Sequence, residues 1–312
     1  MTSPEAPVST RGPRAHKATA IERAGYLPER RARPRPAETA PGATPAAASA
    51  VILLVHDGHE QGLRETVERG IAAALADGTH LPAALFLPPD DAVATLAGVI
   101  ERHRPSGIVL MPPLSARQDL ADLCLRMRTR CIRLGTEPAL SCDERGAAAL
   151  AVGRLVALGH ARIGLVAGPE TSVNARQREL GYLDAMAEHG LDRGPALIVP
   201  GDDSFDSGIA AGRLLLEISP RPTAILAAND AMAAGVLQAA AQAGVPVPAA
   251  LSVLGFDDTP LARCLLPPLA SVRLPWDRMA FEGARRLLGA TGPSLGPFEV
   301  EVVERGSLGP AA

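Results

Sequence analysis

The sequence is poor in the residues that build metal sites, disulfide frameworks and aromatic platforms. Four of its 312 residues are cysteine and aromatic residues make up 3%. The cysteines (Cys124, Cys131, Cys142 and Cys264) lie far apart without a C-x-x-C pair, which argues against a zinc finger or a disulfide framework. We therefore expect no metal site and a chain that works in a reducing compartment.

Several sequence signatures are also missing. No apolar run reaches the ~18 residues of a membrane helix, and the first ~30 residues lack the apolar stretch of a signal peptide. The phosphate-binding loop, the G-x-G-x-x-G dinucleotide loop and the G-x-S-x-G hydrolase turn are absent. We expect a cytoplasmic protein that makes no membrane contact, needs no cofactor and is not an enzyme.

Charge is distributed unevenly along the chain. The whole chain has a formal net charge of -3, whereas residues 1–49 carry eight basic and four acidic side chains, so +4 falls on this segment and about -7 on the remainder. A basic arm on an acidic body is typical of a tail that binds a polyanion. Because 30 of the 31 basic residues are arginine, a general bias in composition is the alternative explanation.

The apolar residues predict an α/β fold. Hydrophobic residues make up 47% of the chain, and residues 34–50, rich in Pro and Ala, read as a linker. From Val51 onward, short continuous apolar runs alternate with segments of helical period. Such runs suit strands of parallel sheets buried on both faces, and their number favours two lobes over one. The six runs are VILLVHD (51–57), GIVLMPP (107–113), RIGLVAGPE (162–170), ALIVPGDD (196–203), AILAAND (224–230) and SVLGFDD (252–258).

Polar residues end these runs, where parallel sheets bind ligands. Carboxylates and amides predominate there and no nucleophile–base pair occurs, so the chemistry suits hydrogen bonds to a sugar or a nucleoside. Helix capping is the alternative for each residue taken alone. The HDGH stretch at 56–59 offers histidines to a metal, but a polar loop is the simpler interpretation.

Two long stretches resemble the lactose/galactose-repressor (LacI/GalR) family of bacterial transcription regulators. They are RLVALGHARIGLVAGPETSVNARQRELGYLDAM (154–186) and RPTAILAANDAMAAGVLQAAAQAGVPVPAALSVLGFDDTPLARCLLPPLASVRLPWDRMAFEGARRLL (221–288). The resemblance implies two Rossmann-like lobes of the periplasmic-binding-protein (type I) kind. It also implies a regulator that senses a small polar metabolite in the cleft between the lobes. We expect the first lobe at about 51–160 plus 274–290 and the second at about 161–273 plus 291–312.

The resemblance also implies candidate effector-binding residues. The family's ligand arginine falls on Arg178, although a surface helix position is the alternative for this residue. The other candidates are Asn229, Asp257, Ser172, Asn174, Asp57 and Phe205. Where many members carry an aromatic platform after the fourth strand, this chain has Asp203, so we expect a smaller or more polar effector, or a lost response.

The N-terminal part resembles only a remnant of the family's DNA reader. Residues 7–33 are similar to its third helix and the start of its hinge, and Pro34 and Pro36 are unfavourable in a hinge helix. We assign 1–33 to this remnant, with weak DNA contacts by Arg30, Arg31 and Arg33. An upstream start, an evolutionary loss of the reader, and an arm that binds phosphates without reading bases are the alternatives.

The resemblance further implies partners. We expect a small-molecule effector, a homodimer, and operator DNA if an upstream reader is present. A stand-alone small-molecule-binding module without DNA binding is the alternative function. An exported solute-binding protein and a modifying enzyme fit less well.

Overall fold

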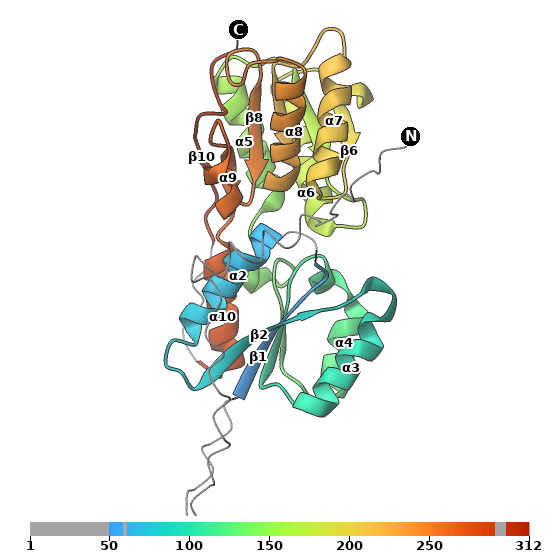
Figure 1. Ribbon diagram of the computed structural model, residues 1–312, viewed down its shortest axis with the longest axis vertical. Helices are drawn as coiled ribbons and strands as arrows, with labels where there is room; N and C mark the ends of the chain where they lie inside the picture. The colour runs from blue at the N-terminus through green and yellow to red at the C-terminus, as the bar shows by residue number, and fades with distance from the viewer. Residues whose placement is uncertain (1–49, 59–60, 291–297, 312) are drawn as a thin grey trace, which may run out of the picture. The chain divides into compact units, whose positions relative to one another are not determined.

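The computed structural model describes residues 50–58, 61–290 and 298–311. The expected headpiece remnant (1–33), with its candidate arginines Arg30, Arg31 and Arg33, lies outside these residues, as does the expected linker (34–50) up to residue 49. Within the described residues, the strands form one sheet of four strands and one of six. This α/β architecture with parallel-sheet lobes is the predicted one (Figure 1).

The first lobe is built around the four-stranded parallel sheet, in the order β2-β1-β3-β4. Helices α3 and α4 cover one face and α2 and α10 cover the other (Figure 1). The elements are β1 (Ala50–His56), α2 (Gln61–Ala74), β2 (His80–Phe86), α3 (Ala92–His103), β3 (Gly107–Leu110), α4 (Gln118–Arg126), β4 (Cys131–Arg133) and α10 (Trp276–Leu287).

The second lobe is built around the six-stranded sheet, in the order β10-β9-β8-β7-β5-β6. Helices α7 and α8 cover one face and α5 and α6 the other. The edge strand β10 runs antiparallel to β9, and the other pairs are parallel. The elements are α5 (Glu144–Ala157), β5 (Ile163–Ala167), α6 (Val173–Glu188), β6 (Ile198–Pro200), α7 (Phe205–Glu217), β7 (Ala224–Ala227), α8 (Asp230–Gln242), β8 (Ser252–Phe256), α9 (Pro260–Cys264), β9 (Ala270–Arg273) and β10 (Glu301–Val303).

The central strands are buried on both faces, as their continuous apolar runs predict. In β1, Ile52 and Leu54 pack with α2 and α10, whereas Leu53 and Val55 pack on the opposite face with α3 and α4. Burying a side chain of this size contributes roughly 1.5–3 kcal/mol, so apolar residues are favoured at every position of such a strand. The alternation of strand side chains then divides one run between two cores.

The structure differs from the sequence expectation in two respects. Strands β2, β4, β9 and β10 were not among the predicted runs, because β2 is mostly exposed and polar residues interrupt the apolar sequences of β4, β9 and β10. Helix α5 packs against α6 and against strands of the second sheet. We therefore place α5 in the second lobe rather than in the first, where the expected boundary near residue 160 would put it.

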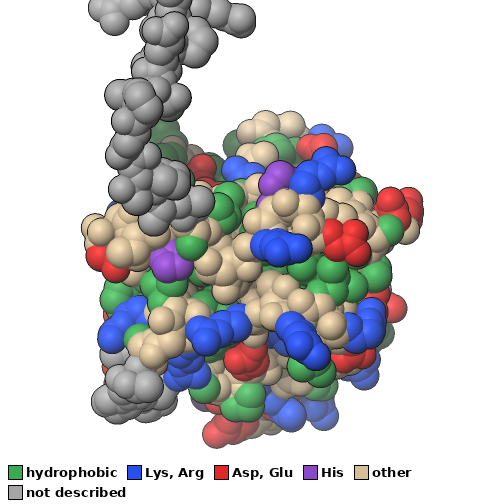
Figure 2. Space-filling view, turned by 90° about the horizontal axis from the view of Figure 1, so that it is seen from below, with side chains coloured by type: hydrophobic (Ala, Val, Ile, Leu, Met, Phe, Trp, Pro, Cys, Tyr) green, Lys and Arg blue, Asp and Glu red, His purple; other side chains and the backbone are tan. Residues whose placement is uncertain are grey.

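The end of the first lobe carries mixed charge. Figure 2 views this end and shows arginine side chains dispersed among acidic and uncharged ones. No described helix is long and apolar enough to cross a membrane.

Candidate functional site

A cavity lies where the carboxyl ends of strands from both sheets meet. Its volume is about 280 Å³. The first lobe contributes residues that follow β1 and β3 and the start of α10, and the second lobe contributes residues that follow β5, β6 and β7. The lining residues are Asp57, Leu63, Pro112, Pro113, Pro169, Thr171, Ser172, Asn174, Ala175, Arg178, Asp202, Asp203, Ala228 and Trp276.

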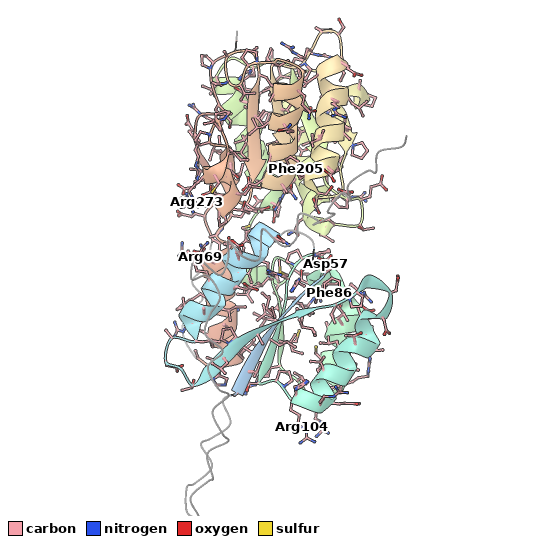
Figure 3. The ribbon with its side chains drawn as sticks, viewed as in Figure 1. Asp57, Arg69, Phe86, Arg104, Phe205 and Arg273 are labelled. Atoms are coloured by element: carbon pink, nitrogen blue, oxygen red, sulfur yellow. The ribbon has the colours of Figure 1, made fainter. Side chains whose placement is uncertain are left out.

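A second cavity of about 380 Å³ adjoins the first and shares Leu63 and Asp203 with it. The remaining sequence candidates, Phe205, Asn229 and Asp257, line this second cavity. Figure 3 shows Asp57 at the end of β1 and Phe205 at the start of α7. The structure thus brings all seven predicted effector-binding residues to two adjoining cavities.

Arg178 is buried and bound by carboxylates on two sides. Its Nε donates to Glu144 Oε2 at 2.7 Å, and its Nη2 donates to Asp257 Oδ1 at 2.9 Å. Its Nη1 donates to the carbonyl oxygen of Ala228, and its Cζ lies 4.6 Å from the centre of the Phe256 ring. The side chain is 7% exposed, so the alternative of a surface helix residue is wrong.

Asp257 connects elements of both lobes. Its Oδ1 accepts hydrogen bonds from Arg178 Nη2 in the second lobe and from Trp276 Nε1, at 3.0 Å, at the start of α10 in the first. Its backbone has a φ of +89°, a conformation that costs a non-glycine residue free energy and that tertiary contacts must maintain. Such strain concentrates at functional sites, and here it directs the carboxylate toward both partners.

Glu144, like Trp276, belongs to this cluster and was missed by the sequence analysis. It is the first residue of α5, and the N-cap Asp143 accepts a hydrogen bond from Gly146 N at 2.8 Å. Burial raises the pKa of Glu144, opposed by the Arg178 guanidinium. Its Oε1 has no hydrogen-bond partner among the described residues. A lone glutamate at the start of an alanine-rich helix reads as an ordinary first-turn acid, so no local signal marks it.

Two candidates, Ser172 and Asn229, cap the starts of helices, as the capping alternative predicts. Ser172 Oγ accepts from Ala175 N at 3.2 Å at the start of α6, and Asn229 Oδ1 accepts from Met232 N at 2.8 Å at the start of α8. The amide of Asn229 also donates to the carbonyl oxygen of Asp203 at 3.0 Å. Asn229 is therefore committed to the scaffold, whereas Asn174 lines the first cavity.

The other acidic residues after the strands divide between the cavities and the scaffold. Asp230 accepts from Ser271 Oγ at 2.6 Å and from the backbone N of Thr259 at 2.7 Å, and burial raises its pKa to about 7. Asp258, beside Asp257 in the sequence, instead pairs with Arg273 and Arg305. The adjacent aspartates thus have different partners, which their sequence spacing does not reveal.

The possible metal site at residues 56–59 has no support in the described residues. His56 is buried, and its Nδ1 accepts a hydrogen bond from Gly58 N at 3.1 Å. Burial lowers its pKa, while His59 lies outside the described residues. Across residues 50–58, 61–290 and 298–311, no three metal-ligating side chains come together.

Comparison with known proteins gives a consistent family. The periplasmic binding protein-like domain matches residues 152–308. The transcriptional regulator AscG of Escherichia coli (strain K12) is 29% identical over 255 residues, which are 78% of this chain and 74% of AscG. The ribose operon repressor of the same strain is 42% identical over 130 residues, 42% of this chain and 39% of that one. The regulator CelR of Thermobifida fusca is 36% identical over 159 residues, 51% of this chain and 47% of CelR. The chain thus spans about half, or less, of the length of the last two relatives.

Solved structures agree with this assignment. A CelR–cellobiose complex has a TM-score of 0.73 and 26% identity, covering 96% of this chain and 92% of that one. A LacI-family regulator from Burkhoderia phymatum has a TM-score of 0.75 and 26% identity, covering 83% of this chain and 99% of that one. The named relatives are transcriptional regulators rather than enzymes.

Proposed function

Because this chain belongs to the periplasmic binding protein-like family of LacI-type transcriptional regulators, we propose that it is the effector-sensing part of such a regulator. Its effector is a small polar metabolite held between the lobes. The observation that carries the proposal is the 280 Å³ cavity at the carboxyl ends of strands from both sheets, with walls from both lobes. Ligands of open α/β folds bind at such ends.

Ligand binding in this cavity changes the relation between the lobes. Asp57 and Trp276 belong to the first lobe, whereas Asn174 and Asp203 belong to the second. A ligand that bonds to both sets stabilises the arrangement in which they face one another, and it shifts the equilibrium by its difference in affinity for the two arrangements. The Trp276–Asp257 hydrogen bond provides a direct connection by which the lobes respond together.

We further propose that Arg178 acts mainly through Asp257 and Glu144 rather than as an open fork for the ligand. Two carboxylates and a backbone carbonyl already receive hydrogen bonds from its guanidinium. The guanidinium fixes Asp257, which lines the second cavity, while Arg178 itself lines the first. The side chains that bind the effector directly are then those of Asn174, Asp57 and Asp203.

The proposed regulator works as a homodimer in the cytoplasm and binds operator DNA if an upstream reader is present. Support for the dimer comes from β2, an edge strand with Leu81 54% exposed and Phe86 52% exposed. An uncovered apolar edge invites pairing with another chain. We expect light scattering to give twice the chain mass, and Leu81→Glu to give the monomer mass with an unchanged circular dichroism spectrum. A monomeric parent chain would contradict the dimer.

The experiment that tests the function combines ligand binding and DNA binding. A panel of sugars, polyols and nucleosides is screened by thermal shift, and a hit is then added to a footprinting assay on the DNA flanking the gene. We expect a hit that raises Tm and changes protection of a two-fold-symmetric site. A hit with no DNA protection, even from a chain extended by its upstream codons, would favour a stand-alone binding module.

A further inference from the structure

A third cavity, at the amino ends of strands in the first lobe, concentrates positive charge. It has a volume of about 580 Å³ and lies between the segments that follow α3 and α4 and lead into β3 and β4. We call it the arginine cavity. Three guanidinium groups and one carboxylate give it a net positive charge, which suits an anionic partner. Its polar side chains are those of Arg104, Arg128, Arg130, Glu101, Ser106 and Thr129.

The guanidinium groups of this cavity are not neutralised within the protein. Arg104 and Arg128 are exposed, and among the described residues their side chains form no ion pair or hydrogen bond. Arg130 donates from Nη1 to the carbonyl oxygen of Leu287 at 2.8 Å, which holds its side chain in place and leaves its charge uncompensated. The positive charge is therefore open to a partner from outside.

The backbone at two of these arginines is unusual for a residue with a side chain. Arg104 ends α3 with a φ of +43°, and its N–H donates to the carbonyl oxygen of Ile100 at 2.9 Å. Arg128 follows α4 with a φ of +52°, and the next N–H, that of Thr129, donates to the carbonyl oxygen of Cys124 at 2.9 Å. Glycine or asparagine is usual at such left-handed helix ends, because a β-carbon is unfavourable there.

Two simpler explanations do not account for these positions. Basic residues in the last turn of a helix offset its dipole, but Arg104 and Arg128 lie beyond the last turns of α3 and α4. The bias of the chain toward arginine explains arginine in place of lysine, not in place of glycine. Backbone strain that persists at an exposed side chain points to a use for that side chain.

The arginine cavity lies where the N-terminal part of the chain joins the body. Ser106 N donates to the carbonyl oxygen of Val51 at 2.8 Å, so the cavity is beside the start of β1, which begins at Ala50. Residues 1–49, with their formal charge of +4, are attached at this end. Figure 3 shows Arg104 on the side of the first lobe away from Asp57. The arginine cavity and the effector cavities therefore lie at opposite ends of the first sheet.

The chemistry of the lining favours double-stranded nucleic acid among polyanions. None of the described residues that line the cavity is aromatic. Sites for single strands stack bases on aromatic side chains, and membrane-surface sites bury an apolar or aromatic face in the lipid. Phosphates of a duplex need only cationic and hydroxyl donors, and the fork of an arginine matches the geometry of a phosphate.

We propose that the arginine cavity binds the phosphate backbone of double-stranded DNA. The sensor body then holds the duplex itself and adds affinity that does not depend on sequence. This inference rests on the proposed function, since it assigns a further DNA contact to the same regulator.

The test measures the salt dependence of DNA binding by the full chain. Fluorescence anisotropy uses two unrelated duplexes of ~30 base pairs, with NaCl raised from about 50 to about 300 mM. We expect Arg104→Gln/Arg128→Gln to weaken binding at the lowest salt at least about tenfold, and equally on both duplexes, because phosphates carry no sequence information. The slope of log Kd against log salt should fall by about 2, since each neutralised phosphate contributes about 0.9.

A second variant separates the role of the side chains from a role in ending the helices. Arg104→Gly/Arg128→Gly suits the left-handed backbone, so we expect a Tm at or above that of the parent, together with the same loss of DNA affinity. Arg193→Gln/Arg221→Gln is the matched control, because both arginines are exposed on the second lobe and line no part of the arginine cavity. It removes the same charge and should change Kd by less than about twofold.

Several results would overturn the inference. They are a parent chain that binds neither duplex at the lowest salt, equal losses in the arginine-cavity variants and the control, and a loss confined to one duplex. Variants that keep their DNA affinity but no longer bind vesicles of anionic phospholipid would assign the cavity to a membrane surface instead.

These results are distinguishable from a failure of the proposed function. Arg104 and Arg128 lie at the opposite end of the first sheet from the effector cavities, so an effector found by thermal shift should raise the Tm of these variants as it does that of the parent. Loss of the DNA effect with this shift intact would overturn the inference alone, whereas the absence of any effector would count against the sensor.

Discussion

Removing the guanidinium of Arg178 should be one of the most destabilising single changes near the cavities. The side chain is 7% exposed and donates hydrogen bonds to Glu144, to Asp257 and to the carbonyl oxygen of Ala228. In Arg178→Ala both carboxylates stay buried without their cation. Breaking a buried ion pair by removing one partner costs about 3–5 kcal/mol, so we expect the free energy of unfolding at pH 7 to fall by roughly this amount.

The assay is urea unfolding followed by circular dichroism, because the midpoint and the slope separate a loss of stability from a change in cooperativity. Arg176→Ala is the control, since Arg176 lies on the same helix and is exposed; it should change stability by about 0.5 kcal/mol or less. A loss below about 1 kcal/mol for Arg178→Ala would refute the claim that the two carboxylates depend on this guanidinium.

Three further predictions concern the scaffold around the cavities. The pKa of Asp230 is raised to about 7 by burial, so the folded state holds a proton that the unfolded state has released above pH ~4. The free energy of unfolding of the parent, relative to that of Asp230→Asn, should therefore fall between pH 5 and 7, by at most about 1.4 kcal/mol per pH unit. Parallel pH profiles of the two proteins would contradict this. Trp276→Phe removes the indole donor to Asp257 and should cost about 1.5–3 kcal/mol in urea unfolding, while a neutral effect would show that the bond between the lobes is dispensable. Gly70→Ala would place a methyl group against the Asp277 carbonyl oxygen between α2 and α10, whereas Gly98→Ala meets open space on α3. We expect Gly70→Ala to lower Tm, and Gly98→Ala to raise Tm through a gain of up to about 1 kcal/mol in the free energy of unfolding. Equal effects of the two variants would contradict the close approach of α2 and α10.

The central strands could be predicted from sequence because burial on both faces leaves a local signature. Continuous apolar runs such as Val51–Val55 and Gly107–Leu110 contribute side chains to the hydrophobic core on each face of the sheet. Strand β2 lacks this signature, because it lies at a sheet edge with mostly exposed side chains. The lobe boundary was misplaced because the alanine-rich sequence of α5 predicts a packed helix but does not say which sheet it packs against.

The candidate residues could be predicted to lie near one another, because they follow strands of parallel sheets, but the pairings of their side chains could not. The rule that ligands meet the carboxyl ends of parallel strands selected Asp57, and family resemblance selected Arg178 and Asp257. Neither could reveal that Arg178 would be paired internally, because its partners lie 34 and 79 positions away in the sequence. Glu144 and Trp276 begin α5 and α10, just after the chain passes from one lobe to the other. No local sequence pattern predicts that these two positions lie beside Arg178 and Asp257.

The most direct test of the sensor cavity is a thermal-shift panel of sugars, amino sugars, polyols and nucleosides on the parent chain and on Thr171→Trp. Thr171 is exposed and lines the first cavity, so the indole fills the cavity without entering a core. We predict a compound that raises the Tm of the parent increasingly with concentration, as binding to the folded state requires, and leaves that of Thr171→Trp unchanged. A panel with no stabilising compound, or a shift of equal size in the filled variant, would contradict a ligand site between the lobes.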